Sequence, residues 1–95
     1  MKTLDEAIEL ILPQFEGMES YIIERSEDEF AAFCHSQLSG GIGMQIRNKL
    51  SLWNDKSDLY QHFVKEHKCE HPDDMSDLII RKIYRIKNES IRNNK

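Results

Sequence analysis

The spacing of apolar residues constrains the fold of this 95-residue chain more than any other feature, because they recur every three or four positions along most of it. This period places apolar side chains on one side of an α-helix, whereas a half-buried strand needs strict alternation. In the first segment, Thr3 and Glu6 form a capping-box pattern, and Pro13 predicts the helix end because proline cannot donate the next backbone hydrogen bond. Ser26 and Glu29 form a second capping-box pattern.

The second half of the chain carries the same kind of signal. The helix that follows the second capping box is expected to hold Leu38 on its apolar face and to end at the glycines 40–41. Apolar residues at spacings of three and four predict another helix directly after these glycines. Ser57 is placed to cap a further helix, and Pro72 suits the first position of the last one.

One stretch, residues 18–24, is compatible with a short buried strand or with a short helix. We favour a helix, because no partner strand is present elsewhere in the sequence. Valine and threonine occur once each, which also disfavours strands. The sequence therefore predicts an all-α fold, a compact single domain of five or six short helices over residues 1–87, followed by a polar, frayed tail over residues 88–95.

Several function classes are disfavoured by simple features of the sequence. No apolar run approaches the roughly 20 residues of a membrane span, and the acidic start lacks the apolar region of a signal peptide. Cys34 and Cys69 are too few for a disulfide framework, which indicates a reducing compartment. We therefore predict a cytoplasmic protein that does not enter a membrane.

Charge is distributed unevenly along the chain, whose net charge is −4. Residues 1–39 have a net charge of −7, residues 40–78 of −2 and residues 79–95 of +5. The overall acidity argues against nucleic acid as the main partner and is compatible with a basic protein partner. The acidic front half would also speed the encounter with such a partner.

The last predicted helix is too apolar for packing on one side only. Beside its core stripe it carries a second apolar stripe, formed by Ile80, Tyr84 and Ile91. Either this helix is central in the domain, or the second stripe contacts another chain, including a second copy in a dimer. Both alternatives remain open at the level of sequence.

The same helix carries a basic flank, formed by Arg81, Arg85 and Arg92. Such a flank is able to contact nucleic-acid phosphates. More often, arginines of this kind are solvated or pair with acids of their own chain. Both interpretations are kept, with the second favoured.

The sequence gives only weak signals for metal binding or catalysis. His62, His67, Cys69 and His71 lie close together in sequence, but their spacing matches no zinc module, and residues 67–71 are interpreted as a polar connector. Cys34 is expected to be a buried structural thiol, because it lies on an apolar helix face. We therefore predict no cofactor, no metal and no catalytic residues.

Asp73 and Asp74 follow Pro72 at the start of the last helix, where the helix dipole favours anions. Arg47 is expected to form an ion pair with an acid such as one of these two, in the planar two-point geometry that guanidinium favours. A structural role is therefore preferred over acid–base catalysis for these residues.

Several runs of the sequence resemble a small uncharacterised bacterial domain family. The match covers roughly residues 26–86 and rests on Gly43-Met44-x-Ile46-Arg47-Asn48, Leu52-Trp53 and His71-Pro72-Asp73-Asp74-Met75-Ser76. Gln45 departs from the pattern, since an aromatic residue is expected there. The family has no established activity, so the resemblance implies a small α-helical fold. It also implies a shared surface or structural network made of His35, Arg47, Asn48, Trp53, His71, Asp73 and Asp74.

Three functional hypotheses follow. The leading one is a non-catalytic protein-interaction module, comparable to immunity proteins and inhibitors that neutralise a basic partner. The first alternative is a nucleic-acid-binding regulator that uses the basic flank. The second alternative is a small metal-dependent enzyme or factor built around His35, His71 and the aspartates.

Overall fold

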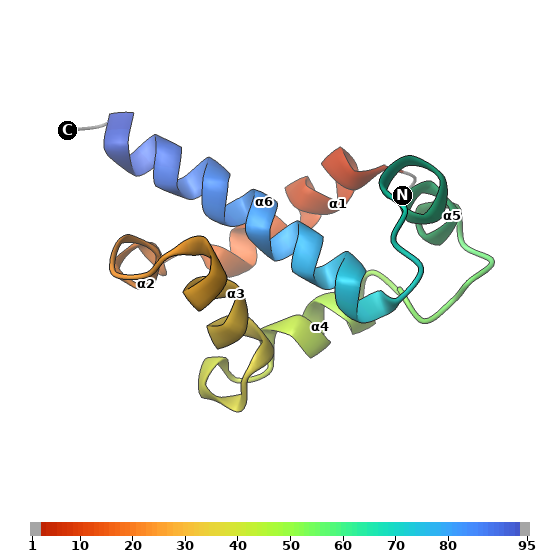
Figure 1. The fold of residues 1–95 in the computed structure, drawn as a ribbon, viewed down its shortest axis with the longest axis horizontal. Helices are drawn as coiled ribbons and strands as arrows, with labels where there is room; N and C mark the ends of the chain where they lie inside the picture. The colour runs from red at the N-terminus through yellow and green to blue at the C-terminus, as the bar shows by residue number, and fades with distance from the viewer. Residues whose placement is uncertain (1–2, 94–95) are drawn as a thin grey trace.

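The computed structural model describes residues 3–93, and within this range it contains six α-helices, two 3₁₀ turns and no strand (Figure 1). The elements are α1 (Leu4–Ile11), η1 (Leu12–Phe15), α2 (Glu19–Ile23), α3 (Glu27–His35), η2 (Gln37–Ser39), α4 (Ile42–Lys49), α5 (Asp58–His67) and α6 (Pro72–Asn93). The predicted all-α fold is confirmed, and the ambiguous stretch contains a helix, as favoured. Within residues 3–93, no helix combines the length and apolar character needed to cross a bilayer.

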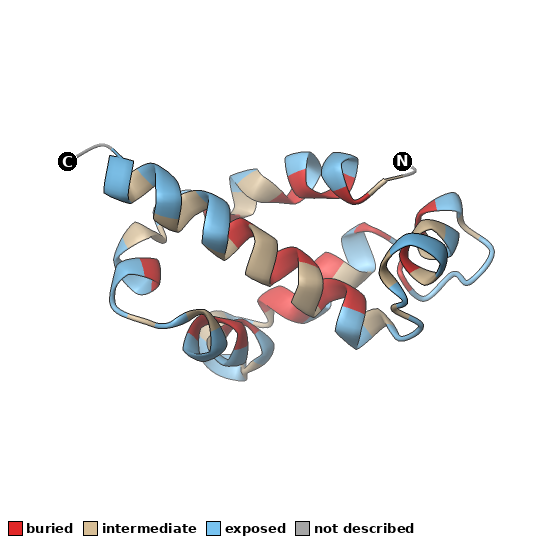
Figure 2. Cartoon of the chain, turned by 45° about the horizontal axis from the view of Figure 1, so that its top comes forward, coloured by how far each residue is buried: buried red, intermediate tan, exposed pale blue. Residues whose placement is uncertain are grey.

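Helix α6 is the centre of the fold. It crosses the molecule diagonally in Figure 1 and packs against α1, α2, α3 and α4. Figure 2 shows buried residues along the part of α6 that these helices cover. The buried residues of α6 are Met75, Ser76, Ile79, Ile80 and Ile83. Each fully buried isoleucine contributes about 2 kcal/mol of hydrophobic stabilisation.

The predicted caps start the helices where expected. The Thr3 hydroxyl accepts a hydrogen bond of 3.2 Å from the backbone N–H of Glu6. At Ser26 the capping box is complete: its hydroxyl accepts from the Glu29 N–H, and the Glu29 carboxylate accepts from the Ser26 N–H. Helix α1 ends at Ile11, two residues before Pro13, and Pro13 lies inside the 3₁₀ turn η1, where its missing donor costs little.

The predicted end of α3 is wrong. The Ser36 hydroxyl donates to the carbonyl of Phe33 at 2.7 Å and accepts from the N–H of Leu38 at 3.3 Å. These local bonds replace the helical ones, so α3 ends at His35. Leu38 consequently lies in η2 and is 86% exposed, off the apolar face on which it was expected.

Two further boundaries differ from the sequence prediction. Helix α5 includes His67, the first residue of the predicted connector, and ends because Lys68 adopts a left-handed conformation with φ 55°. Helix α6 continues to Asn93, so residues 88–93 are helical where a frayed tail was expected. Asn94 and Lys95 lie outside the described residues.

The second apolar stripe of α6 belongs to the interior. Ile80 is fully buried, so its prediction as an interface residue is wrong. Tyr84 packs its ring 5.6 Å from that of Phe30 and donates its hydroxyl to the Arg25 carbonyl at 2.6 Å. Ile91 is half-buried against the same core. The stripe therefore reflects the central position of α6.

Candidate functional site

A surface hollow lies where the end of α3, helix α4 and the first turns of α6 meet. Its volume is about 420 Å³, and each residue that lines it is of a polar or charged type. The lining residues are His35, Arg47, Asp73, Asp74 and Asp77. Four of these five were predicted from the family resemblance, so the structure brings together most of that network in one place.

Arg47 is the best anchored charge of this hollow. Its side chain is 13% exposed, and one guanidinium N–H donates to Ser76 Oγ at 3.1 Å and lies 3.3 Å from Asp73 Oδ1. Ser76 is fully buried and donates to the Asp73 carbonyl at 3.0 Å. The predicted ion pair between Arg47 and one of the two aspartates is thus formed with Asp73, but through a single nitrogen and not in the two-point geometry that was expected. Arg47 Nε is buried and has no hydrogen-bond partner among the described residues.

His35 closes the opposite side of the hollow. Its Nε2 lies 3.1 Å from Asp77 Oδ1. The ring can take this position because Gly43 of α4 has no side chain. A Cβ at Gly43 would lie 2.8 Å from His35 Nδ1 and 3.2 Å from Arg47 Nη1. The glycine at position 43 therefore leaves the space that the side chains of His35 and Arg47 occupy beside α4.

Trp53 links this hollow to a second one. Its indole N–H donates to Asn48 Oδ1 at 3.1 Å, and its ring lies 5.9 Å from the Arg47 guanidinium carbon. Trp53 itself remains 60% exposed. The second hollow has a volume of about 660 Å³ and is lined by Trp53, Asp55, Tyr60, Gln61, Val64, Glu70, His71 and Pro72.

The second hollow combines aromatic rings with carboxylates. Tyr60 is held in place because its hydroxyl donates to the carbonyl of Glu70 at 2.6 Å. Asp55, Glu70 and the neighbouring Asp74 form no ion pair with any other described residue. Negative charge is therefore available on this part of the surface.

The predicted residues divide between the two hollows. His35, Arg47, Asp73 and Asp74 line the first, whereas Trp53 and His71 line the second. Asn48 positions the indole between them. Sequence reasoning missed Asp55, Tyr60, Glu70, Ser76 and Asp77. Only Asp77 had a usable signal, since it stands four residues after Asp73 and four before Arg81, on one helix face.

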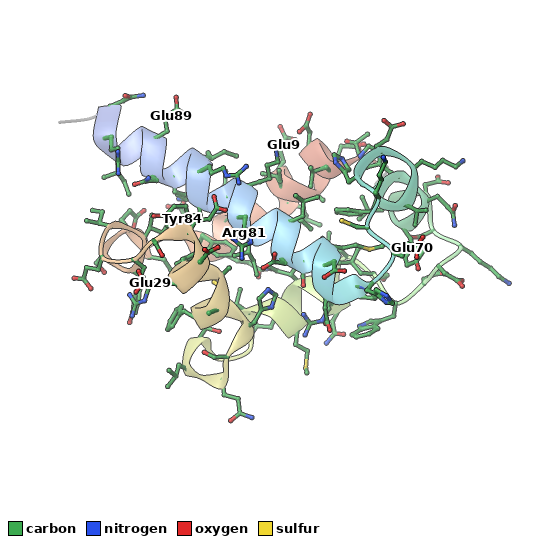
Figure 3. The ribbon with its side chains drawn as sticks, viewed as in Figure 1. Glu9, Glu29, Glu70, Arg81, Tyr84 and Glu89 are labelled. Carbon is green, nitrogen blue, oxygen red and sulfur yellow. The ribbon has the colours of Figure 1, made fainter. Side chains whose placement is uncertain are left out.

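The predicted basic flank is largely paired within the chain. Arg81 contacts Glu27 at 3.2 Å, Asp28 at 2.5 Å and Asp77 at 2.8 Å. Figure 3 shows Arg81 and Tyr84 on the part of α6 that crosses α3. The hydrogen bonds that Arg81 donates to Asp28 and Asp77 raise the pKa of its guanidinium, so its charge is fixed.

Arg85 and Arg92 complete the flank. Arg85 Nε donates to Glu27 Oε1 at 2.5 Å, and this bond lowers the pKa of the Glu27 carboxyl. Arg92 is exposed and forms no ion pair with a described residue. We define Glu27, Asp28, Asp77, Arg81 and Arg85 as the α3–α6 ion-pair cluster.

The fold and the two hollows define a small helical domain with a polar surface site. Over residues 2–87 the chain matches the family described as a domain of unknown function (DUF6794), and it belongs to that family. No curated protein and no solved structure matches it. The resemblance to an uncharacterised domain family is thereby confirmed.

Proposed function

We propose that this domain is a non-catalytic protein-interaction module that binds a basic segment of a partner protein. The binding surface is the α6-start face, which we define as the two hollows together with the exposed Met44 on α4. Met44 stands three and four residues before Arg47 and Asn48, so it projects from the same side of α4 as these residues. It is 58% exposed.

The observation that carries the proposal is the second hollow. Trp53 and Tyr60 place two aromatic rings at its surface, and Asp55 and Glu70 place two carboxylates beside them. A lysine or arginine side chain is attracted both by aromatic faces and by unpaired carboxylates. Tryptophan is also one of the residue types that are enriched among the energetic hot spots of protein interfaces.

The first hollow extends the acidic surface that is complementary to a basic partner segment. Asp73 and Asp74 continue the acidic surface along the first turn of α6, next to His71 and Pro72 of the second hollow. Acidic charge spread over such a face favours a segment with several basic residues over a single cation. It also speeds association in a manner that salt weakens.

Other features of the chain support binding over the alternative functions. Burial raises the pKa of the Cys34 thiol to about 12, which makes it a poor nucleophile. The carboxylates of the α3–α6 ion-pair cluster occupy Arg81 and Arg85, so nucleic-acid phosphates would have to displace them. Both cysteines are free, which accords with the cytoplasmic location that we propose.

A defined peptide tests the second hollow directly. Trp53 is the only tryptophan of the chain, so its fluorescence reports on this surface alone. We expect a short arginine-rich peptide to change this fluorescence saturably, and the same peptide with citrulline in place of arginine to do so far more weakly, because citrulline keeps the shape and loses the charge. Equal responses to the two peptides would contradict the proposal.

Matched variants localise the effect. Glu70→Gln and Glu9→Gln each remove one negative charge, but Glu70 lies beside the connection from α5 to α6 and Glu9 lies on α1 (Figure 3). We expect Glu70→Gln to weaken peptide binding about three- to tenfold, and Glu9→Gln to leave it nearly unchanged. Equal weakening by both would indicate attraction by net charge alone.

The natural partner is sought by capture with the tagged domain from its native host, with and without nuclease. The captured protein is then purified and its affinity measured for wild type, Trp53→Ala and Leu10→Ala, the last being an exposed apolar residue of α1. We expect a basic partner whose binding falls at least about tenfold in Trp53→Ala only. Recovery that depends on nucleic acid, or equal loss in both variants, would overturn the proposal.

A further inference from the structure

Two histidines of α5 meet at a separate hollow. His62 Nε2 and His67 Nε2 are 3.3 Å apart, and both rings line a depression of about 410 Å³ between α5, the start of α1 and α6. Four possible donors lie in this part of the sequence, namely His62, His67, Cys69 and His71, and their spacing matches no zinc module. The extension of α5 to His67 brings two of the four together.

We propose that His62 and His67 form a binding site for a divalent transition-metal ion of the zinc class. Zinc binds imidazole nitrogen at about 2.0–2.1 Å, so two nitrogens of a tetrahedral site lie about 3.3–3.4 Å apart. The observed separation of 3.3 Å matches this bite. Without metal, one neutral imidazole donates its N–H to the other across the same distance.

The orientation of the rings agrees with a shared ion. Their centroids are 5.0 Å apart and their planes are inclined by 69°. Rings pointing head-on at one another would have more widely separated centroids at this nitrogen distance. The two rings therefore do not both point straight along the line between the nitrogens, and a common ion to one side of that line requires such an inclination.

Core packing holds both rings near this geometry. The ring of Phe63, which is fully buried, lies 6.2 Å from that of His62 and 5.9 Å from that of His67. The helix ends directly after His67, because Lys68 is in the left-handed conformation. The site is thus built on a helix whose apolar face is anchored, which limits the reorganisation that metal binding would require.

The surrounding charges favour a cation only moderately. Asp5 and Glu66 line the same hollow and attract it, whereas Lys82 lines the hollow and opposes it. No group of three or more metal-ligating side chains converges anywhere in residues 3–93. The ion therefore keeps open positions for water or for a carboxylate, and its affinity lies below that of a four-residue structural site.

The test is a calorimetric titration of the metal-free protein with zinc chloride. We expect saturable binding of one ion per chain. His62→Ala and His67→Ala should each weaken it at least about tenfold, because each removes one of two protein ligands. His35→Ala and His71→Ala are the matched controls and should leave it within about twofold. Absence of binding, millimolar binding only, or loss in a control variant would overturn the proposal.

Two further measurements make the outcome independent of variant folding. In wild-type protein, zinc should shift the ring-proton resonances of His62 and His67 and leave those of His35 and His71 in place. Cys69→Ser removes the competing thiol donor, whose pKa is already raised by burial, and should not change the affinity. Shifts centred on His71, or loss of binding in Cys69→Ser, would assign the ion elsewhere.

Discussion

Two parts of α6 carry similar numbers of charged side chains and use them in opposite ways. In the middle of the helix, the arginines of the α3–α6 ion-pair cluster contact carboxylates of the same chain at 2.5–3.2 Å. At its start, Asp74 and the adjacent Glu70 remain without an ion pair to any described residue. The middle is internally neutralised, whereas the start presents its charge to solvent.

This difference shows that the net charge of a segment does not determine what the segment can bind. Residues 79–95 have a net charge of +5, yet Arg81 and Arg85 are occupied. The available charge is the part that the fold leaves unpaired, and around the start of α6 Asp74 and Glu70 make that part acidic. The comparison therefore favours a basic partner at the α6-start face over nucleic acid at the basic flank.

The largest stability effect is expected at Arg47, a charged residue of the α6-start face whose side chain is only 13% exposed. Arg47→Ala should lower the free energy of unfolding by about 2–3 kcal/mol, because it removes hydrogen bonds to Ser76 and Asp73 and the packing of its stem. Urea unfolding measures this loss. Lys49→Ala, at an exposed position of the same helix, should cost less than about 0.5 kcal/mol. Equal losses would mean that Arg47 is not an anchor.

A smaller effect is expected in the ion-pair cluster. Arg81→Ala should lower the free energy of unfolding by about 1–2 kcal/mol, since three carboxylates lose their shared partner. Arg92→Ala should have almost no effect, because Arg92 has no ion pair with a described residue. In about 1 M NaCl the Arg81 effect should shrink, as screening weakens partly exposed pairs. If Arg92→Ala lowered the free energy of unfolding as much as Arg81→Ala, the ion pairs of Arg81 would not account for its contribution to stability.

The cluster should also make stability depend on acidity. The hydrogen bond from Arg85 and that from Arg81 lower the pKa of Glu27 below its ordinary 4.5. This contribution to stability is therefore fully present above pH 4.5 and is lost as the pH falls through the lower folded-state value. Urea midpoints followed into acid should decline less steeply in Glu27→Gln than in wild type. Identical acid profiles would exclude Glu27 as a contributor.

The smallest net effect on stability is expected at Gly43. Gly43→Ala gains about 1 kcal/mol of helix propensity, and a loss of similar size is expected because the new Cβ would lie 2.8 Å from His35 Nδ1. The unfolding free energy should therefore change little, while the His35 ring resonances shift because the contact with Asp77 opens. Unchanged His35 resonances would show that the ring does not depend on the missing side chain.

The local features of the fold were predictable because their causes lie within a few residues. The Thr3 hydroxyl cap and the capping box at Ser26 start α1 and α3 where expected, and the glycines at 40–41 adopt left-handed conformations before α4. The end of α3 was missed because Ser36 offers its backbone neighbours hydrogen bonds that compete with the helix. Helical periodicity alone does not reveal such competition.

The site was only partly predictable, because its contacts join distant segments. Arg81 and Asp28 are 53 residues apart, and Arg85 and Glu27 are 58 residues apart. The family resemblance supplied most residues of the first hollow, but no sequence spacing relates His35 to Asp77. Likewise, the meeting of His62 and His67 depends on where α5 ends, which is set by the left-handed Lys68.

The central position of α6 has a consequence for the order in which the protein is made. Helices α1 to α4 all pack on α6, which follows them in the chain, so they leave the ribosome before the surface that covers them exists. Their apolar faces stay exposed to solvent or to chaperones until α6 has been synthesised. A chain that stops before α6 therefore cannot form the hydrophobic core. During synthesis, the apolar faces of α1 to α4 are most accessible to chaperones and proteases just before α6 is made.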